Sequence, residues 1–175
     1  MDTIREYLPH PTPESLTSHL AQLDSFAEEE QSDVTAYPGV VELLASLPSY
    51  RWAVVTSASE KIMRSRLAAA GILTPTHTVG GDTVRLGKPH PEGYLRGAGI
   101  LTRQPQECLV IEDAPAGVRA GKAAGCQVLA VASSHRLNEL QEADWIIASI
   151  DQIAVSVDPE TLTLNLKFPA LQSCG

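Results

Sequence analysis

Short apolar runs alternate with stretches of helical character through the middle of the chain. Expected strands cover residues 52–56, 108–112, 127–132 and 144–149, and expected helices cover 60–71, 116–124, 136–143 and a segment opened by Pro91. Strands that alternate with helices are typical of βα units, in which successive strands lie parallel in one sheet. The pattern therefore predicts the α/β class, with a mostly parallel sheet flanked by helices.

The chain before the first βα unit has a different pattern. Residues 13–31 predict an amphipathic helix, because Thr12 can cap it, Pro13 suits its first turn and leucines recur near helical spacing. An acidic stretch then leads to the turn signal Tyr37-Pro38-Gly39, and a short helix is expected over 40–47. We divide the chain into residues 1–36, 37–168 and 169–175.

The end of the chain predicts a hairpin. Residues 154–168 alternate between apolar and polar side chains on both sides of Asp158-Pro159, which is the pattern of two paired strands joined by a turn. The last residues, 169–175, do not continue this pattern and are expected to form a loose end.

Composition restricts the kinds of partner. The formal net charge is −8, and nucleic acids and anionic membranes need clustered Lys and Arg, so neither is an expected partner. No apolar stretch approaches the roughly 20 residues of a membrane span, and residues 1–10 have no signal-peptide core. The three cysteines, Cys108, Cys126 and Cys174, have no C-x-x-C spacing, which favours free thiols in a reducing compartment. We expect a cytoplasmic protein.

Three strand ends carry groups suited to a phosphorylated ligand, and ligands of open parallel sheets bind beyond such ends. The first is Thr56-Ser57-Ala58-Ser59, where hydroxyls and amides lead into a helix and can bind an anion. The alternative is that Ser57 or Ser59 only caps that helix.

The second strand end is followed by Gly87-Lys88-Pro89-His90-Pro91, and the third ends in Glu112-Asp113. The prolines fix the backbone around Lys88, and a rigidly presented ammonium suits a phosphoryl dianion; the alternative is a solvated surface lysine. Carboxylate oxygens suit Mg²⁺, although Asp113 could instead cap the next helix. Because all three segments follow strands, we favour one common site.

These segments resemble motifs of the haloacid dehalogenase superfamily of phosphatases. TSAS is similar to its second motif, GKPHPEGYLRGAG to its third and LVIEDAPAGVRAGKAAG to its fourth. The third and fourth resemble most the branch with fungal glycerol-phosphate and 2-deoxyglucose-6-phosphate phosphatases. The resemblance implies a Rossmann-like fold and Mg²⁺-dependent hydrolysis of a small sugar or polyol phosphate.

The resemblance also implies roles for the residues of the three segments. Phosphate binding is implied for Thr56, Ser57, Ala58 and Lys88, catalysis for Thr56 and Lys88, and metal binding for Asp113 and Glu112.

One motif of the family has no counterpart. The first motif, D-x-D-G-T/V after an opening strand, supplies the nucleophilic and acid/base aspartates, and no D-x-D occurs in these 175 residues. Asp2 has no strand before it that would place it over the sheet. Residues 1–36 instead resemble the closing half of the helical cap that follows the first motif. We therefore expect a cap remnant at 1–36 and a core at 37–168 that lacks the usual first strand.

Three hypotheses on function remain open. The chain is a Mg²⁺-dependent phosphomonoesterase that is complete only with an N-terminal segment, a non-catalytic phosphate- or metabolite-binding or regulatory protein, or a truncated gene product. The expected partner is a small phosphorylated metabolite, and a vacant strand position makes a homo-oligomer possible. We expect no phosphatase activity from these residues alone.

Overall fold

The structure is a computed structural model that describes residues 12, 34–73, 75–158, 160–161 and 163–173. Its helices are α3 (Val40–Ser46), α4 (Glu60–Ala69), α5 (Glu92–Ile100) and α6 (Pro115–Ala123). Its strands are β1 (Val54–Val55), β2 (Thr78–Val79), β3 (Leu109–Glu112), β4 (Gln127–Val131), β5 (Trp145–Ile147), β6 (Ala154–Val157), β7 (Leu164–Lys167) and β8 (Gln172–Ser173). The helix expected over 13–31 lies outside the described residues, and of the expected cap remnant, 1–36, only residue 12 and the irregular segment 34–36 are described.

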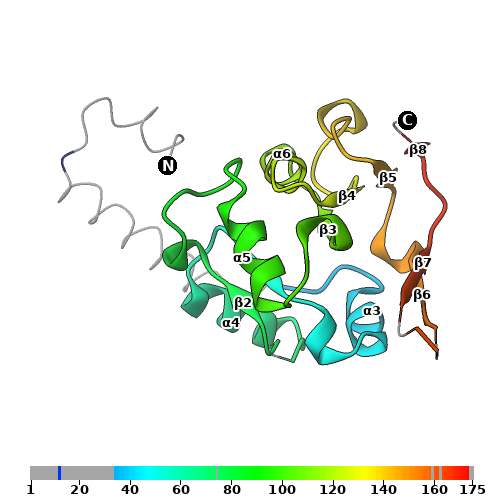
Figure 1. Ribbon diagram of the computed structural model, residues 1–175, viewed down its shortest axis with the longest axis horizontal. Helices are drawn as coiled ribbons and strands as arrows, with labels where there is room; N and C mark the ends of the chain where they lie inside the picture. The colour runs from blue at the N-terminus through cyan, green and yellow to red at the C-terminus, as the bar shows by residue number, and fades with distance from the viewer. Residues whose placement is uncertain (1–11, 13–33, 74, 159, 162, 174–175) are drawn as a thin grey trace.

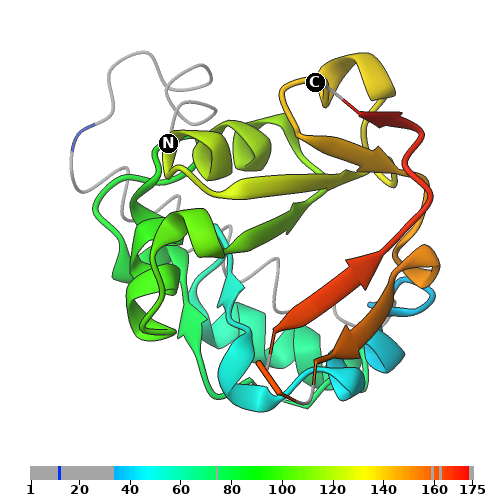
Figure 2. The same ribbon diagram turned by 45° about the vertical axis from the view of Figure 1, so that its right-hand side comes forward.

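The predicted α/β class is confirmed by three parallel strands at the centre of the molecule (Figures 1 and 2). β3, β4 and β5 lie side by side in that order, with Ile111 paired to Leu129 and Leu129 to Trp145. Val128, Leu129, Ala130 and Ile146 are fully buried. Parallel strands covered on both faces are expected to be continuously apolar, as β4 is from Val128 to its end.

The remaining strands form smaller units. β1 pairs in parallel with β2, and β6 and β7 form the antiparallel hairpin that was predicted. The Asp158 side chain accepts hydrogen bonds from the amides of Glu160 and Thr161 in the hairpin turn. Figure 2 shows this hairpin, coloured orange to red, beside the gap between β1 and β3.

β1 and β3 do not pair with each other. In the described part of the chain, β1 pairs with β2 alone and β3 with β4 alone, so each has one open edge. For the described residues, these two open edges confirm the prediction that the sheet lacks its usual first strand.

Two details differ from the sequence pattern. The helix predicted over 136–143 is wrong, because only the short 3-10 turn Leu137–Glu139 forms there. Leu140 and Ala143, which follow this turn, are buried. Because a single turn suffices to place two apolar side chains three residues apart, their burial does not require a longer helix. In the tail, Gln172 and Ser173 pair with β5 as β8, and the sequence pattern predicted neither β8 nor β2.

Among the described helices, none is both long and apolar enough to cross a membrane. The thiols of Cys108 and Cys126 are free. Burial raises the pKa of Cys126 to about 11 and also raises the pKa of Cys108, so both are mainly protonated near neutral pH.

Candidate functional site

Lys88 connects the carboxyl ends of β1 and β3. Its ammonium donates a hydrogen bond of 3.3 Å to the carbonyl of Val55 and forms an ion pair with the Glu112 carboxylate. The Lys88 side chain is 19% exposed, so the alternative of a fully solvated surface lysine is wrong. The second and third sequence segments therefore meet at one place, and Val55 brings the adjacent Thr56 to the same edge.

Glu112 has both carboxylate oxygens engaged. Oε1 accepts hydrogen bonds from Lys88 and from the Tyr94 hydroxyl, and Oε2 accepts from the amides of Asp113 at 3.2 Å and Ala114 at 3.4 Å. A Cβ on Gly117, in the first turns of α6, would overlap this carboxylate. The packing thus holds Glu112 as a fixed counter-charge to Lys88.

Tyr94 is a buried member of this cluster that the sequence analysis missed. Burial, followed by the neighbouring Glu112 carboxylate, raises the pKa of Tyr94 far above its ordinary value, so its hydroxyl stays a donor. The Lys88 ammonium also lies 5.1 Å from the centre of its ring, within cation–π range. The available signal was the spacing of Tyr94, Gly97 and Ala98, which form the buried face of α5.

Asp113 has a different environment. Ser134 Oγ lies 2.7 Å from Asp113 Oδ2 and 2.8 Å from His135 Nδ1, and it orients the carboxylate. α6 begins after Ala114 without a side-chain cap, so the alternative that Asp113 only caps this helix is wrong. Among the described residues, the hydrogen bond to this carboxylate comes from Ser134 and reaches Oδ2, so Oδ1 can serve as a ligand oxygen.

A hard cation such as Mg²⁺ fits Asp113 better than Glu112. Mg²⁺ is usually held by one or two carboxylates together with waters and substrate phosphate, and Asp113 supplies an oriented carboxylate. No group of three or more His, Cys, Asp or Glu side chains suited to a metal occurs in the described part of the chain. A metal at this site would therefore depend on oxygen ligands besides those of the protein described here.

The segment after β1 is folded against Gly81, which follows β2. Thr56 Oγ1 accepts a 3.1 Å hydrogen bond from the amide of Ala58, so the Thr56 hydroxyl proton can be donated to a ligand. Ser59 caps α4 through its side chain, and the capping alternative is therefore correct for Ser59, whereas Ser57 is exposed. A Cβ on Gly81 would overlap the Ser57 carbonyl, so this glycine allows the close approach of the β2 end.

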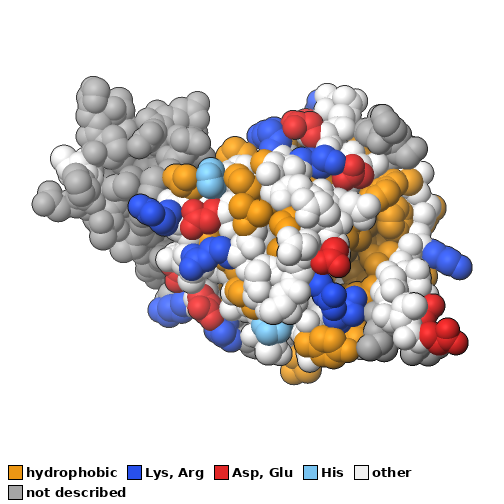
Figure 3. All heavy atoms as spheres, in the orientation of Figure 1, with side chains coloured by type: hydrophobic (Ala, Val, Ile, Leu, Met, Phe, Trp, Pro, Cys, Tyr) orange, Lys and Arg blue, Asp and Glu red, His pale blue; other side chains and the backbone are white. Residues whose placement is uncertain are grey.

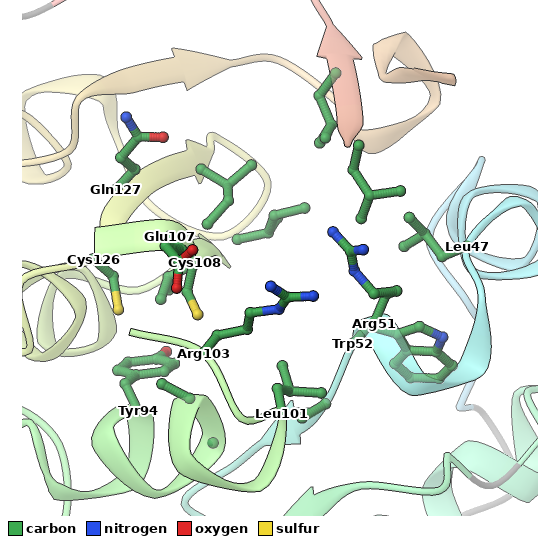
Figure 4. A pocket seen from close by; sticks show the side chains of 18 of the residues that line it. Leu47, Arg51, Trp52, Tyr94, Leu101, Arg103, Glu107, Cys108, Cys126 and Gln127 are labelled. Atoms are coloured by element: carbon green, nitrogen blue, oxygen red, sulfur yellow. The ribbon is translucent and has the colours of Figure 1, made fainter. Parts of the chain in front are cut away.

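A cavity of about 740 Å³ lies along the strands below this cluster. Its walls include β1, β3, α5 and the β6–β7 hairpin (Figure 4). In Figure 3, hydrophobic side chains line a hollow beside the hairpin. Val55 and Ile111 line the cavity, whereas Thr56, Lys88, Glu112 and Asp113 do not, so the polar cluster lies beyond its carboxyl-terminal end.

The chain is similar to characterised phosphatases. It is 38% identical to hexitol phosphatase A of Escherichia coli (strain K12) over 159 residues, which cover 90% of this chain and 74% of that protein. It is 38% identical to glycerol-1-phosphate phosphohydrolase 2 of Saccharomyces cerevisiae over 130 residues, which cover 67% of this chain and 52% of that protein. The chain therefore spans about half the length of this yeast relative.

Solved structures and a family profile agree with these similarities. A crystal structure of a hydrolase from Pseudomonas syringae aligns with a TM-score of 0.75 at 26% identity and covers 81% of this chain and 70% of that chain. The profile of the haloacid dehalogenase-like hydrolases matches residues 2–131. This match includes all three segments that meet around Lys88, and the chain belongs to the haloacid dehalogenase-like hydrolase family.

Proposed function

We propose that the cluster around Lys88 binds the phosphate of a small sugar or polyol phosphate and is the phosphate- and metal-binding part of a phosphomonoesterase site. The observation that carries this proposal is the position of Lys88, whose ammonium lies at the ends of both β1 and β3. The names of the relatives, a hexitol phosphatase and a glycerol-1-phosphate phosphohydrolase, support a small polyol phosphate as the substrate class.

Each predicted residue has a role that its contacts support. The Thr56 hydroxyl and the Ser57 amide donate to phosphoryl oxygens, and Lys88 neutralises their charge. The amide of Ala58, also predicted to bind phosphate, already donates to Thr56 and acts by orienting that hydroxyl.

The metal role falls mainly on Asp113. Bound there, Mg²⁺ would supply positive charge against the phosphoryl oxygens. Glu112 was predicted as a second ligand, and this role stays a prediction; its contacts with Lys88, Tyr94 and two amides favour a supporting function.

The nucleophile is the component that these residues do not supply. Phosphoryl transfer through an aspartyl-phosphate needs a free carboxylate that attacks phosphorus, and a second acid must protonate the leaving alkoxide. No D-x-D occurs in the sequence, and the Glu112 oxygens are engaged. We therefore infer that these 175 residues bind the phosphate group without turning it over.

The binding part is tested by calorimetry with Mg²⁺ and inorganic phosphate. Wild type should bind the pair with an affinity that falls at least ~10-fold in Lys88→Ala and Asp113→Asn, because each removes one charge from the site. Glu142→Gln is the control, since its side chain is 61% exposed and its ion-pair partner is Arg119, which is not one of the predicted site residues. Equal affinity in all four proteins would contradict the site.

The catalytic part is tested with glycerol phosphate, 2-deoxyglucose 6-phosphate and an aryl phosphate. We expect no turnover from this chain, and turnover after a D-x-D-G-T strand is fused in cis. Turnover near the ~10 s⁻¹ of a typical enzyme by the chain alone, lost in Lys88→Ala, would contradict the inference. Phosphate binding without turnover in the fused protein would favour the second hypothesis, a non-catalytic binding protein. A cytoplasmic location stays a prediction.

A further inference from the structure

The turn after β4 brings a second pair of polar side chains to the site. Because β3 and β4 pair in parallel, the residues beyond their carboxyl ends lie at one edge of the sheet. The Ala132 amide donates a 2.9 Å hydrogen bond to the Ile147 carbonyl of β5, which holds the start of this turn against the sheet. Ser134 follows in the same turn, and its hydroxyl reaches the main-chain carbonyl of Asp113 at 3.2 Å as well as the Asp113 carboxylate.

Three side-chain atoms form a chain of contacts that ends at this carboxylate. Ser134 Oγ lies 2.7 Å from Asp113 Oδ2 and 2.8 Å from His135 Nδ1. The first distance is that of a hydroxyl that donates to an ionised carboxylate, about 2.5–2.7 Å. The second lies within the range of an N–H donor and an oxygen acceptor, about 2.7–3.2 Å. Both contacts are therefore hydrogen bonds, and each needs one proton.

The number of protons fixes the direction of these two hydrogen bonds. A carboxylate that binds a metal is ionised, and an ionised carboxylate accepts hydrogen bonds but donates none. The single proton of the Ser134 hydroxyl must point to Asp113, because two oxygen acceptors 2.7 Å apart would repel each other without a proton between them. The proton of the second bond must then belong to His135 Nδ1. His135 in this tautomer has its unprotonated ring nitrogen at Nε2.

The direction of the chain decides which oxygen of Asp113 is presented to a ligand. With His135 Nδ1 protonated, Oδ2 is engaged by Ser134, and Oδ1 is the oxygen available to a cation. With the proton on Nε2, the imidazole would accept from Ser134 at Nδ1, and Oδ2 would lose this donor. Hydrogen bonds that orient a ligating side chain are typically worth about 10–100-fold in metal affinity. The tautomer of His135 therefore acts on the carboxylate through Ser134.

We propose that His135 is a positioning residue of the metal site. Its Nδ1–H donates to Ser134 Oγ, directs the Ser134 proton onto Asp113 Oδ2 and so presents Oδ1 to a divalent cation. The proposal rests on the metal role of Asp113 in the proposed function, and it adds a residue that lies outside the three sequence segments of the site. Ser134 is exposed and His135 is partly buried, so substitutions at both positions should leave the fold intact.

The first test determines the tautomer of His135 in the full chain without metal. Nitrogen-15 NMR of labelled histidine side chains is recorded at a pH at which the imidazole is neutral. We expect the chemical shift and the one-bond N–H coupling of a protonated ring nitrogen at Nδ1, and an unprotonated Nε2. In Ser134→Ala the acceptor of this proton is removed, so His135 should become a mixture of both tautomers.

The second test is a titration with Mg²⁺ alone, followed by the chemical shifts of the Asp113 and Ala114 amides. Ser134→Ala should weaken binding at least ~10-fold and His135→Leu at least ~3-fold. His135→Asn should bind nearly as tightly as wild type, because its side-chain amide can donate in place of Nδ1. Ser133→Ala is the matched control, since Ser133 is the exposed serine next to Ser134, and it should not change the affinity. With a neutral imidazole, none of these substitutions changes the charge of the site.

Three results would overturn the role of His135 alone. The first is a proton on Nε2 instead of Nδ1 in wild type. The second is equal Mg²⁺ affinity of wild type and His135→Leu while Asp113→Asn has lost binding. The third is an equal loss in His135→Asn and His135→Leu, because packing and not a donor would then be responsible. If wild type itself binds no Mg²⁺, the proposed metal site fails together with the role of His135, so the two kinds of failure are distinguishable.

Discussion

The two sides of β3 show how the same kind of sequence behaves with and without a neighbouring strand. On the β4 side, Val128, Leu129 and Ala130 are fully buried. On the β1 side, Ile111 is 36% exposed, and Leu109, Val54 and Val55 are only partly buried. All are apolar residues in short parallel strands. Burial therefore depends on the neighbouring strand as much as on the side chain.

The polar cluster of Lys88, Glu112 and Tyr94 has contacts with strands on both sides of the cavity. Glu112 is held in register by its pairing with Ala130 of β4. The pairing of β3 with β4 therefore positions the carboxylate that forms the ion pair with Lys88. The other contact of Lys88, the Val55 carbonyl, comes from across the open side. Lys88 thus forms polar contacts with the ends of both β1 and β3. These contacts connect two strands that do not pair through main-chain hydrogen bonds.

The largest expected effect is on the free energy of unfolding, and it compares truncation of a side chain in β5 with truncation of a side chain at the open edge of β3. Ile146→Ala removes a fully buried side chain from β5, and such changes typically cost about 2–5 kcal/mol of the free energy of unfolding. Ile111→Ala is the matched change in the open strand and should cost no more than about half as much, because part of the side chain is already in water. Urea denaturation measures both. Equal losses would show that Ile111 is as well packed as Ile146.

The second prediction uses two helical glycines. Gly117→Ala places a Cβ against the Glu112 carboxylate, and we expect about 1–3 kcal/mol of destabilisation together with weaker phosphate binding. Gly99→Ala in α5 meets open space and should stabilise the fold by about 0.5–1 kcal/mol. Denaturation and calorimetry of both variants test the pair. A neutral Gly117→Ala would mean that Glu112 is free to move.

The third prediction concerns the tyrosine beneath Lys88. Tyr94→Phe leaves Glu112 Oε1 without one of its two donors, and we expect a loss of about 1–2 kcal/mol in the free energy of unfolding. Tyr50 is 58% exposed, so Tyr50→Phe should change stability by less than about 0.5 kcal/mol. If both tyrosines give the same small effect, the Tyr94 hydrogen bond is not a structural element of the site.

These examples show what the sequence could and could not predict. The apolar runs of β3, β4 and β5 have lengths typical of strands, and Lys88 follows an expected strand while Glu112 ends one, so their meeting was predictable. Tyr94 and Ser134 were not, because their roles depend on contacts between segments that are distant in sequence. The helix wrongly expected over 136–143 illustrates the same point, since helical spacing does not show whether one turn is enough.

The smallest expected effect is a pH dependence of the free energy of unfolding, and it arises from a carboxylate beside β4 and β5. Asp144 lies before β5, where it accepts hydrogen bonds from Lys122 at 2.6 Å and from the amide of Val128 at 2.8 Å. Burial alone would raise the pKa of Asp144, but these two hydrogen bonds together with the positive charge of Lys122 hold the pKa below its ordinary value of 3.8. The Val128 amide at the start of β4 thus has a charged acceptor, whereas the open edge of β3 has no paired strand among the described residues.

A lowered pKa in the folded state fixes the sign of this prediction. The ionised form stabilises the fold above the unfolded-state pKa, and this contribution is lost as the pH falls through the lower folded-state pKa. Asp144→Asn should therefore cost about 1 kcal/mol at pH 7, and its difference from wild type should shrink below about pH 4. Glu142→Gln is the control, because its side chain is 61% exposed and lies 3.7 Å from its partner Arg119. Urea denaturation of the three proteins between pH 3 and pH 7 measures this difference, and a difference that stays constant across the range would assign the cost to packing instead of charge.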